Sequence, residues 1–449
     1  MTRRRHPRHD EADATGGAQV KVGAFWSLMA GHRDMRRLWL GETAAAFGTF
    51  FFDIAVMWYV FVRTGSGLDT GIVAVAAFLP MVALGPWFGA LADRTHRRRL
   101  MVWSNVGSAA LAAALTITVG LGAQAIWPVY VVTALLGAAA ALYDPARAGI
   151  FPEIVPPEEL MAANALFHTS RQVARVVGST VGGVVIAVAG AAATMSADVL
   201  AFGAAAALVA GVHYAYPSVP ADDSGRGPGR TRMTEDLGEA WRWIRQRPVL
   251  LVMSAIGMVS NIALGPANVL APMLIRQSFH ATAAALGIFD AAIGAGIIAG
   301  GVVIGMLTLD RLGLSLTVAL AVEGMGLALV ALSPAPWTAD LGNLLLGIGL
   351  VTANAPGATM MQTLVPAGLR GRVNSLVGMM SALAIPITYG AVGVVGDAIG
   401  AHASYGLAAV LMAGCVLAAL AVKDIRAFRL SAHAAPVAAP AAAHGVDVP

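Results

Sequence analysis

The chain has 449 residues, of which 57% are hydrophobic and 12% charged, and its formal net charge is +4. Because soluble proteins carry about 25% charged residues, this composition excludes an ordinary soluble globular protein and is typical of a protein that crosses a membrane many times. The basic residues lie mainly between apolar segments, where they indicate membrane topology, so no nucleic-acid partner is expected. The single cysteine, Cys415, offers no disulfide and no metal-site spacing, and we expect no metal or other cofactor.

Residues 1–37 form a polar, Arg-rich tail. The apolar stretch that follows is longer than a signal-peptide core and lacks a cleavage-site pattern, so we expect the mature protein to keep it as its first span. Twelve such stretches are each long enough to cross about 30 Å of hydrocarbon as a helix. They begin near Leu38, Gly71, Leu100, Trp127, His168, Thr194, Val249, Ala284, Ser315, Thr338, Val373 and Ala403.

Residues 215–248 interrupt this series after the sixth stretch with a charged tract rich in Gly, Arg and Pro, which predicts a linker. The sequence therefore predicts an all-α membrane protein with two six-helix bundles, in residues 38–214 and 249–422. The Ala/Pro/His-rich residues 423–449 are expected to form a disordered tail.

The linker contains an amphipathic segment from Thr234 to Gln246. Its apolar residues recur at helical spacing, at Leu237, Ala240, Trp241 and Ile244. Two interpretations fit this pattern: a helix that lies along the inner membrane surface, or a solvated linker helix without a role of its own.

An even number of spans puts both termini on one side of the membrane. Of the 29 Lys and Arg residues, only Arg63 and Arg276 then fall on the opposite side. Excess basic charge in short loops marks the cytoplasmic face, so we expect a multi-pass protein of the cytoplasmic (inner) membrane with a cytoplasmic linker and both termini in the cytoplasm.

The two halves of the chain resemble each other. Residues 154–166 align with residues 364–376, and both segments end in Asn-x-Leu. Trp127 and Trp337 keep the same offset at the predicted outer ends of the fourth and tenth helices. Parallel repeats of this kind are typical of transporters built from two equivalent bundles.

The loop between the second and third spans carries a run of motif residues: Gly89, Leu91, Asp93, Arg94, Arg97, Arg98 and Arg99. This run resembles the inner-loop motif of the major facilitator superfamily, and the likeness extends over nearly the whole chain. The segments Arg36–Gly41, Asp144–Arg147 and Gln362–Arg372 resemble the drug-proton antiporter branch, which includes macrolide efflux proteins and the enterobactin exporter.

The fifth span resembles the antiporter signature of that branch through Gly178, Gly182 and Gly183, with Ser179 in place of its usual proline. The resemblance implies a transporter, not an enzyme, that exports a small amphipathic molecule such as a drug, macrolide or siderophore by alternating access. It also implies a proton gradient as the energy source. We expect the substrate, protons and the lipid bilayer as partners, and a monomer.

The resemblance further implies that Asp93 and the nearby arginines form a charge latch against neighbouring helix ends. Helix termini carry partial charge, and a partly desolvated Asp–Arg pair is strengthened in a low dielectric. The alternative is that the arginines are topological anchors only.

Four carboxylates fall inside the predicted spans: Glu42, Asp53, Asp290 and Glu323. A carboxylate at bilayer depth costs about 2.5 to 3.5 kcal/mol, so each is expected to face a cavity or a partner. Asp53 is the first candidate for proton coupling. Glu42 could instead pair with Arg36 or Arg37, Asp290 is expected near the wet outer end of its helix, and Glu323 is either a cavity residue or neutral in a helix contact.

Arg171 and Arg175 are predicted at the inner end of the fifth helix, where they either snorkel to headgroups or, in the case of Arg175, help to hold the inner gate. Trp58 and Asn354 are candidates for the substrate cavity, although Trp58 points about 140° away from Asp53 on an ideal helix. An importer or facilitator on the same fold is the first alternative function. A membrane-embedded enzyme or receptor is a remote one, because no catalytic pattern is visible.

Overall fold

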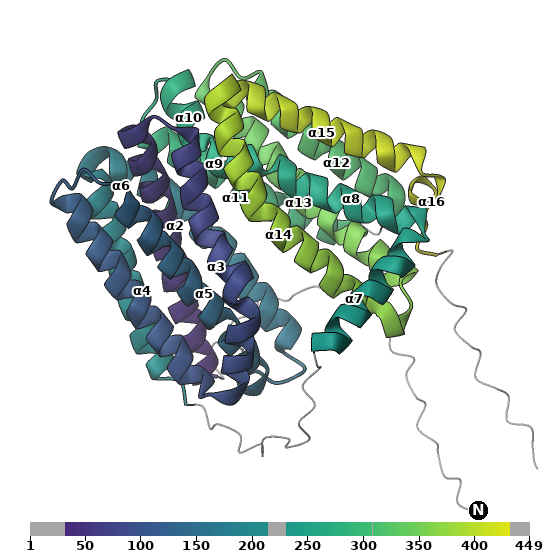
Figure 1. The fold of residues 1–449 in the computed structure, drawn as a ribbon, viewed down its shortest axis with the longest axis horizontal. Coiled ribbons are helices and arrows are strands. Elements are labelled where there is room, and N and C mark those ends of the chain that lie inside the picture. The colour runs from purple at the N-terminus through teal and green to yellow at the C-terminus, as the bar shows by residue number, and fades with distance from the viewer. Residues whose placement is uncertain (1–31, 214–229, 308, 432–449) are drawn as a thin grey trace, which may run out of the picture.

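The computed structural model describes residues 32–213, 230–307 and 309–431, and helices make up nearly all of this part of the chain. Residues 1–31 of the predicted N-terminal tail, residues 215–229 of the linker and residues 432–449 of the predicted C-terminal tail lie outside the described residues. The prediction of disorder from residue 423 onward is wrong at its start, because Lys423–Arg426 form a short helix and Phe428 is buried. Figure 1 shows two helical bundles next to each other, the N-terminal one in purple and blue and the C-terminal one in green and yellow.

The N-terminal bundle consists of five long helices: α2 (Arg33–Thr64), α3 (Gly67–Arg94), α4 (Arg97–Gly120), α5 (Trp127–Ile154) and α6 (Leu160–Ala210). The last of these has 51 residues, which would reach about 76 Å if straight, far more than one membrane crossing needs. Its helical geometry breaks at Gly190, where φ is 84° and ψ is 170°, a conformation that glycine adopts without strain. The two halves of α6 are therefore the fifth and sixth spans.

The C-terminal bundle begins with α8 (Pro248–Ala263), which is followed by the short helices α9 (Gly265–Val269) and α10 (Ala271–Met273) and a π-helical turn (Leu274–Ser278). It continues with α11 (Ala283–Met306), α12 (Leu312–Ala331), α13 (Pro336–Leu364), α14 (Ala367–Ile399), α15 (Ala401–Ala421) and the short α16 (Lys423–Arg426). Within the described residues, eleven helical segments are long and apolar enough to cross a membrane. Counting α6 twice confirms the predicted twelve spans in two six-helix bundles.

The predicted amphipathic helix is α7 (Arg230–Arg245), which packs against α14 of the C-terminal bundle. Its residues Ala240 and Ile244 are buried in a cluster with Val373 on α14. Nη1 of Arg372 lies 2.6 Å from a carboxylate oxygen of Glu239 on α7. The apolar side of α7 is thus only partly covered by protein, because Ala240 and Ile244 are buried whereas Trp241 is 40% exposed. The side chain of Leu237 lies outside the described part.

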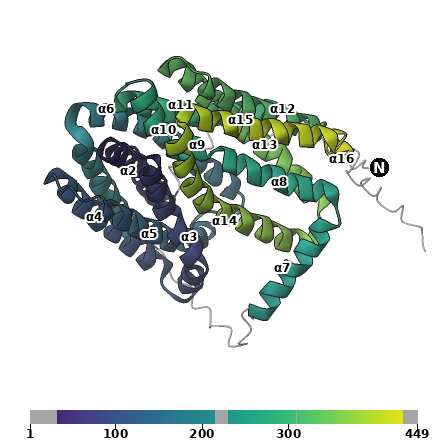
Figure 2. The same cartoon turned by 45° about the horizontal axis from the view of Figure 1, so that its top comes forward.

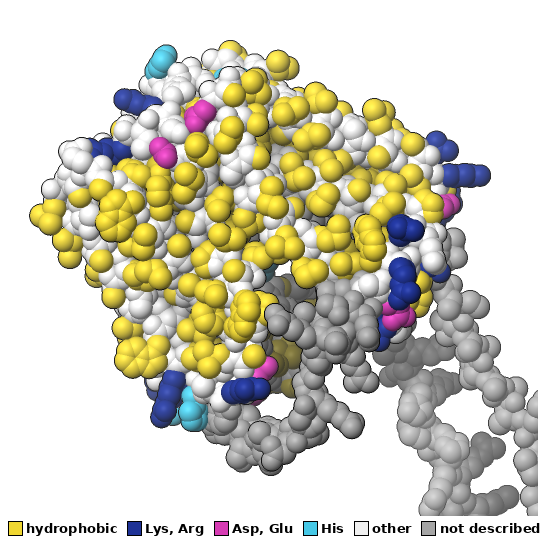
Figure 3. Space-filling view, viewed as in Figure 1, with side chains coloured by type: hydrophobic (Ala, Val, Ile, Leu, Met, Phe, Trp, Pro, Cys, Tyr) yellow, Lys and Arg dark blue, Asp and Glu magenta, His cyan; other side chains and the backbone are white. Residues whose placement is uncertain are grey.

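The outer surface of the molecule is apolar over its middle and charged at its ends. Figure 3 shows hydrophobic side chains over most of one face, with Lys and Arg side chains near the extremities. Large apolar side chains such as Val188 and Leu417 are 84% and 67% exposed. Exposed apolar area of this extent is normal only where lipid, not water, surrounds the protein.

We call the end of the molecule that carries Arg94 and Arg97 the basic end, and the opposite one the distal end. The α2–α3 turn at Gly65 and the α14–α15 turn at Gly400 lie at the distal end, because successive spans run in opposite directions. These names assign no side of the membrane.

The two bundles touch mainly along two helix pairs, α3 with α14 and α6 with α11, with smaller contacts of α3 with α9 and of α2 with α10 and α11. Figures 1 and 2 both show α3 beside α14. A Cβ atom added to Gly71 of α3 would lie 2.7 Å from the carbonyl oxygen of Tyr389, and one on Gly287 of α11 would lie 2.3 Å from that of Ser179. Only glycine permits backbones to approach this closely.

These contacts are confined to the distal half. Nearer the basic end, a Cβ on Gly85 or Gly89 of α3, or on Gly371 or Gly378 of α14, would meet no atom within 4 Å. The glycines near the basic end of α11, Gly301 and Gly305, are equally free of neighbours. The bundles therefore pack together at the distal end and separate toward the basic end.

Candidate functional site

An ion pair between Arg175 on α6 and Asp290 on α11 joins the two bundles. Nη2 of Arg175 lies 2.7 Å from Oδ1 of Asp290, and Nε lies 3.4 Å from Oδ2. The two side chains are only 23% and 24% exposed. Two contacts between one guanidinium and one carboxylate hold the two side chains in a defined relative orientation and stabilise both charges. This pair therefore ties the bundles together.

The position of this pair corrects two predictions. The fifth span begins at Leu160, not near His168, which places Arg171 and Arg175 in the interior of the helix. Arg175 therefore does not snorkel to headgroups. Asp290 is not simply wet, because it is partly buried and engaged by Arg175.

Ser179 adds a third contact to the same carboxylate. Its hydroxyl donates to Oδ2 of Asp290 at 2.5 Å. Ser179 also lies at the point where α6 and α11 approach most closely, beside Gly183 and Gly287. The glycines of the signature divide between two neighbours: Gly178 and Gly182 face α2, whereas Gly183 faces α11.

A cavity of about 320 Å³ lies beside the ion pair and is lined by residues of both bundles. Asp53 lines this cavity and is exposed to it. Aromatic and apolar side chains, among them Phe50, Phe78 and Tyr389, make up much of the remaining wall. The structure thus combines a free carboxylate, an ion pair and an apolar surface in one cavity at the bundle boundary.

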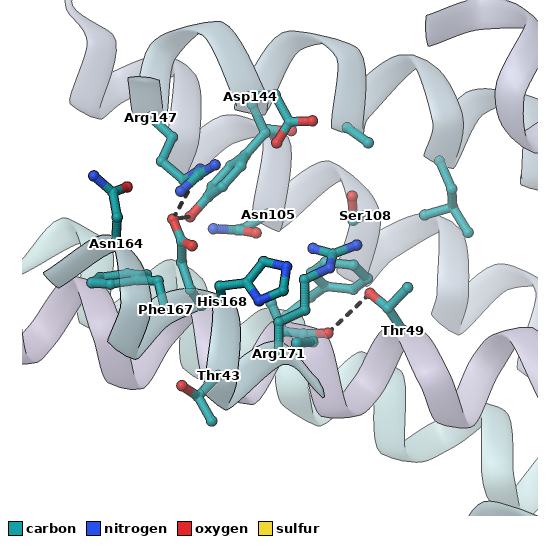
Figure 4. A pocket seen from close by; sticks show the side chains of 18 residues that line it. Thr43, Thr49, Asn105, Ser108, Asp144, Arg147, Asn164, Phe167, His168 and Arg171 are labelled. Carbon is teal, nitrogen blue, oxygen red and sulfur yellow. Dashed lines mark hydrogen bonds and ion pairs between the residues drawn. The ribbon is translucent and has the colours of Figure 1, made fainter. Parts of the chain in front are cut away.

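A second cavity, of about 490 Å³, lies within the N-terminal bundle closer to the basic end. Figure 4 shows Arg147, His168 and Arg171 around it. Glu42 lies in its wall, 3.5 Å from Nε of Arg147, and accepts a hydrogen bond from the Tyr143 hydroxyl at 3.4 Å. The predicted pairing of Glu42 with Arg36 or Arg37 is therefore wrong, because α5 brings Arg147 closer.

Glu323 on α12 lies in a helix contact, which is one of its two predicted environments. It is fully buried, and its Oε1 accepts a hydrogen bond from the Ser260 hydroxyl on α8 at 2.7 Å. A Cβ on Gly349 of α13 would lie 2.5 Å from the Glu323 backbone nitrogen. Glu323 lines neither of the two cavities.

The two residues predicted to line the substrate cavity lie elsewhere. Trp58 is partly buried and packs against the buried apolar side chains of the core, and Asn354 is exposed on α13. Neither lines the two cavities described above.

The sequence analysis missed Asp198, in the second half of α6. It is 1% exposed, and neither of its carboxylate oxygens has a hydrogen-bond partner among the described residues. A Cβ on Gly48 of α2 would lie 2.6 Å from its Oδ1, so α2 covers it closely. The rule that identified the other four carboxylates, an acidic residue inside an apolar stretch, applies equally to Asp198.

In the loop motif, Asp93 contacts only its own bundle. Its carboxylate lies 3.6 Å from Nη2 of Arg97 and is 76% exposed. Arg97 also pairs with Glu153 at 3.0 Å, and Arg98 donates to the carbonyl oxygen of Val212 at 2.8 Å. The arginines of the motif thus tie α4 to α5 and to the end of α6.

Metal-ligating residue types do not cluster in the part of the chain that the structure describes: no three His, Cys, Asp or Glu side chains there could hold an ion.

Known proteins resemble this chain over most of its length. A family model of transmembrane secretion effectors matches residues 26–445. Macrolide efflux protein A of Streptococcus pyogenes is 22% identical over 353 residues, which cover 78% of this chain and 86% of that protein. Multidrug efflux pump Tap of Mycobacterium bovis is 29% identical over 395 residues, which cover 85% and 91%.

Among solved structures, the nucleoside transporter NupG has the same fold, with a TM-score of 0.68 at 12% identity over 86% of this chain and 98% of that one. The match to the family model spans nearly the whole chain, and the bundle architecture agrees with it. The chain therefore belongs to the transmembrane secretion effectors of the major facilitator superfamily and is a membrane transporter, not an enzyme.

Proposed function

We propose that this transporter is a proton-driven exporter of small amphipathic molecules and acts as a monomer. The observation that supports this most directly is the Arg175–Asp290 ion pair at the bundle boundary, with Asp53 in the wall of the same cavity. Macrolide efflux protein A and the multidrug efflux pump Tap, which are similar to this chain, support export of such compounds. A single chain lines the whole cavity, so a second copy is not needed to complete it.

The proposed orientation places the basic end, the linker and both termini in the cytoplasm of a cell whose inner membrane the protein crosses. Basic residues concentrate on the side that faces the cytoplasm. The conformation described above is then inward-facing, since the bundles separate toward the basic end. A substrate enters from that side, and rocking of the bundles exposes it to the other.

The charges at the bundle boundary can link this rocking to protons. Opening the distal end must separate α6 from α11 and so break the Arg175–Asp290 pair. Separating Arg175 from Asp290 costs free energy while both side chains are charged and partly buried. Protonation of another carboxylate in the same cavity removes one negative charge near the pair and so changes this cost. We propose Asp53 as the group that gains a proton outside and loses it inside. Glu42, Asp290 and Glu323 stay secondary candidates.

The latch at the basic end is the second part of this proposal. Asp93 is exposed, its one ion pair with a described residue is that with Arg97, and the N-terminus of α14 has no side-chain cap. When the basic end closes, α3 approaches α14 and the Asp93 carboxylate can interact with a helix N-terminus, which attracts negative charge. Asp93→Asn should then abolish transport while expression is unchanged, and undiminished transport would remove the latch.

The test of proton-driven export uses inside-out vesicles that contain the full-length protein. A proton gradient should drive accumulation of macrolides or cationic dyes, and Asp53→Asn should uncouple that accumulation from the gradient. Transport by the native protein that ignores the gradient would make it a facilitator, and loss of uptake by cells on deletion would make it an importer. If Asp53→Asn keeps the full proton-driven rate, Asp53 is not the coupling group.

A further inference from the structure

Three arginines line the two cavities, and two of them are in ion pairs. Arg147 pairs with Glu42 in the cavity within the N-terminal bundle, which we call the Glu42 cavity, and Arg175 pairs with Asp290 at the bundle boundary. Arg171, one helical turn from Arg175, forms neither a hydrogen bond nor an ion pair with any described residue. An arginine inside a membrane protein keeps its charge and is stabilised by a counter-charge or by water.

Arg171 lies between the two cavities. It is the one residue that belongs to the walls of both, the cavity of Glu42 and the cavity of Asp53. Figure 4 shows it beside His168 in the cavity within the N-terminal bundle. Its long flexible side chain can therefore present the guanidinium to either space.

Two carboxylates, Asp53 and Asp290, line the cavity at the bundle boundary, and Asp53 is the one without an ion pair. The charged and titratable side chains that share its surroundings are Arg171 and Arg175 on α6, Asp290 on α11, Tyr389 on α14 and the buried Asp198. Arg175 is already held by Asp290, and Asp198 and Tyr389 offer no positive charge. Among the described side chains around Asp53, Arg171 is the cation that remains to neutralise it when it is ionised.

We propose that Arg171 is the positioning residue of proton coupling: its guanidinium pairs with Asp53 when that carboxylate is ionised and withdraws toward the Glu42 cavity when Asp53 is protonated. The proton leaves the Asp53 carboxyl group for water in the cavity and returns to the same oxygen atoms, so no other reactant is needed. In the present conformation Arg171 and Asp53 line one cavity with no ion pair between them, which is the arrangement that this proposal assigns to protonated Asp53. This inference rests on the proposed role of Asp53 but not on the direction of transport.

The test measures protonation of Asp53 directly. Dicyclohexylcarbodiimide reacts with protonated carboxyl groups, and mass spectrometry of the purified full-length protein can quantify its adduct on Asp53 as a function of pH. Removing the counter-charge in Arg171→Gln should raise the pH of half-maximal labelling by about one unit or more. Arg171→Lys, which keeps the charge, should stay close to the native value.

Arg147→Gln is the matched control, because it removes a cation from the far side of the Glu42 cavity and should leave the labelling of Asp53 unchanged. An unchanged midpoint in Arg171→Gln, or an equal shift in Arg147→Gln, would overturn the proposal. The labelling requires no gradient, so its outcome is separate from that of the vesicle assay. A shift in Arg171→Gln together with gradient-independent transport would support the Arg171–Asp53 pairing and reject proton-driven export.

Discussion

Oδ1 of Asp397, near the distal end of α14, accepts a hydrogen bond from the backbone nitrogen of Gly67 in the first turn of α3 at 2.5 Å. Its Oδ2 accepts from the nitrogen of Leu68 and from the Ser66 hydroxyl, each at 2.9 Å. A residue of the C-terminal bundle thus caps a helix of the N-terminal one. A carboxylate at a helix N-terminus is favoured by the unpaired N–H groups and the helix dipole there.

Asp397→Ala should destabilise the conformation with a closed distal end by about 1 kcal/mol. The equilibrium between the closed and the open distal end should then shift about fivefold toward the open one. Leu121 and Leu332 are 82% and 80% exposed on the distal side of the two bundles. Spin labels at these two positions should show a larger population of long label-to-label distances in the variant. The labelled cysteines are introduced into a Cys415→Ser background. Asp69→Asn is the control, because Asp69 bonds to Tyr130 within one bundle. Equal distance distributions in Asp397→Ala and native protein would contradict the assignment.

A methyl group at Gly287 should disrupt the α6–α11 contact. Its Cβ would lie 2.3 Å from the Ser179 carbonyl oxygen and 3.0 Å from the Gly183 Cα, and a backbone cannot yield as a side chain does. Overpacking of this kind costs about 1–3 kcal/mol, so Gly287→Ala should lower the thermal unfolding midpoint in detergent and slow transport. Gly301→Ala on the same helix meets no atom within 4 Å and should behave like the native protein. If both variants match the native protein, the close approach is not required.

The Ser179 hydroxyl should stabilise the ion pair that it contacts. Ser179→Ala removes a hydrogen bond to a charged group, which contributes about 1.5–3 kcal/mol, and leaves one oxygen of Asp290 with less support. We expect a lower unfolding midpoint. Thr180→Ala removes the neighbouring hydroxyl, which bonds only to the Val176 carbonyl of its own helix, and should have little effect. A larger loss in Thr180→Ala than in Ser179→Ala would reverse this interpretation.

The contact between Ser431 and the Asp310 carboxylate should weaken at low pH. The backbone N–H of Ser431 donates to Asp310 at 2.9 Å and lowers the pKa of this carboxyl group below its ordinary value of 3.8. The folded state therefore binds the proton less readily than the unfolded state. The contact stabilises the segment above pH 3.8, and the contribution is lost as the pH falls from there through the lowered pKa.

Hydrogen–deuterium exchange of the peptide that contains Ser431, corrected for intrinsic rates, measures this effect. At neutral pH, Asp310→Asn should exchange faster than the native protein, and the difference should vanish once Asp310 is protonated. Asp424→Asn, at an exposed position on α16, is the control and should not change exchange. Identical exchange in Asp310→Asn and native protein at neutral pH would show that the segment is held by other contacts.

The sequence predicted the spans well because crossing a membrane depends on a local property, the transfer free energy of about twenty consecutive residues. It placed several helix starts too late, most of all that of the fifth span, which begins at Leu160 because the more polar turns before His168 are helical too. The helix predicted near Val373 likewise begins at Ala367. It also singled out Asp53, Asp290 and Arg175, since a charged residue in an apolar stretch is conspicuous whatever its surroundings.

The partners of those charges were decided by tertiary structure alone. Arg175 and Asp290 are separated by 115 positions and meet only because glycines let α6 and α11 approach. Glu42 pairs with Arg147 of α5 and not with its sequence neighbours, and Asp397 caps a helix 330 residues earlier in the chain. Hydropathy is a sum over neighbours along the chain, whereas an ion pair depends on a distance of a few ångströms between bundles, which only their packing sets.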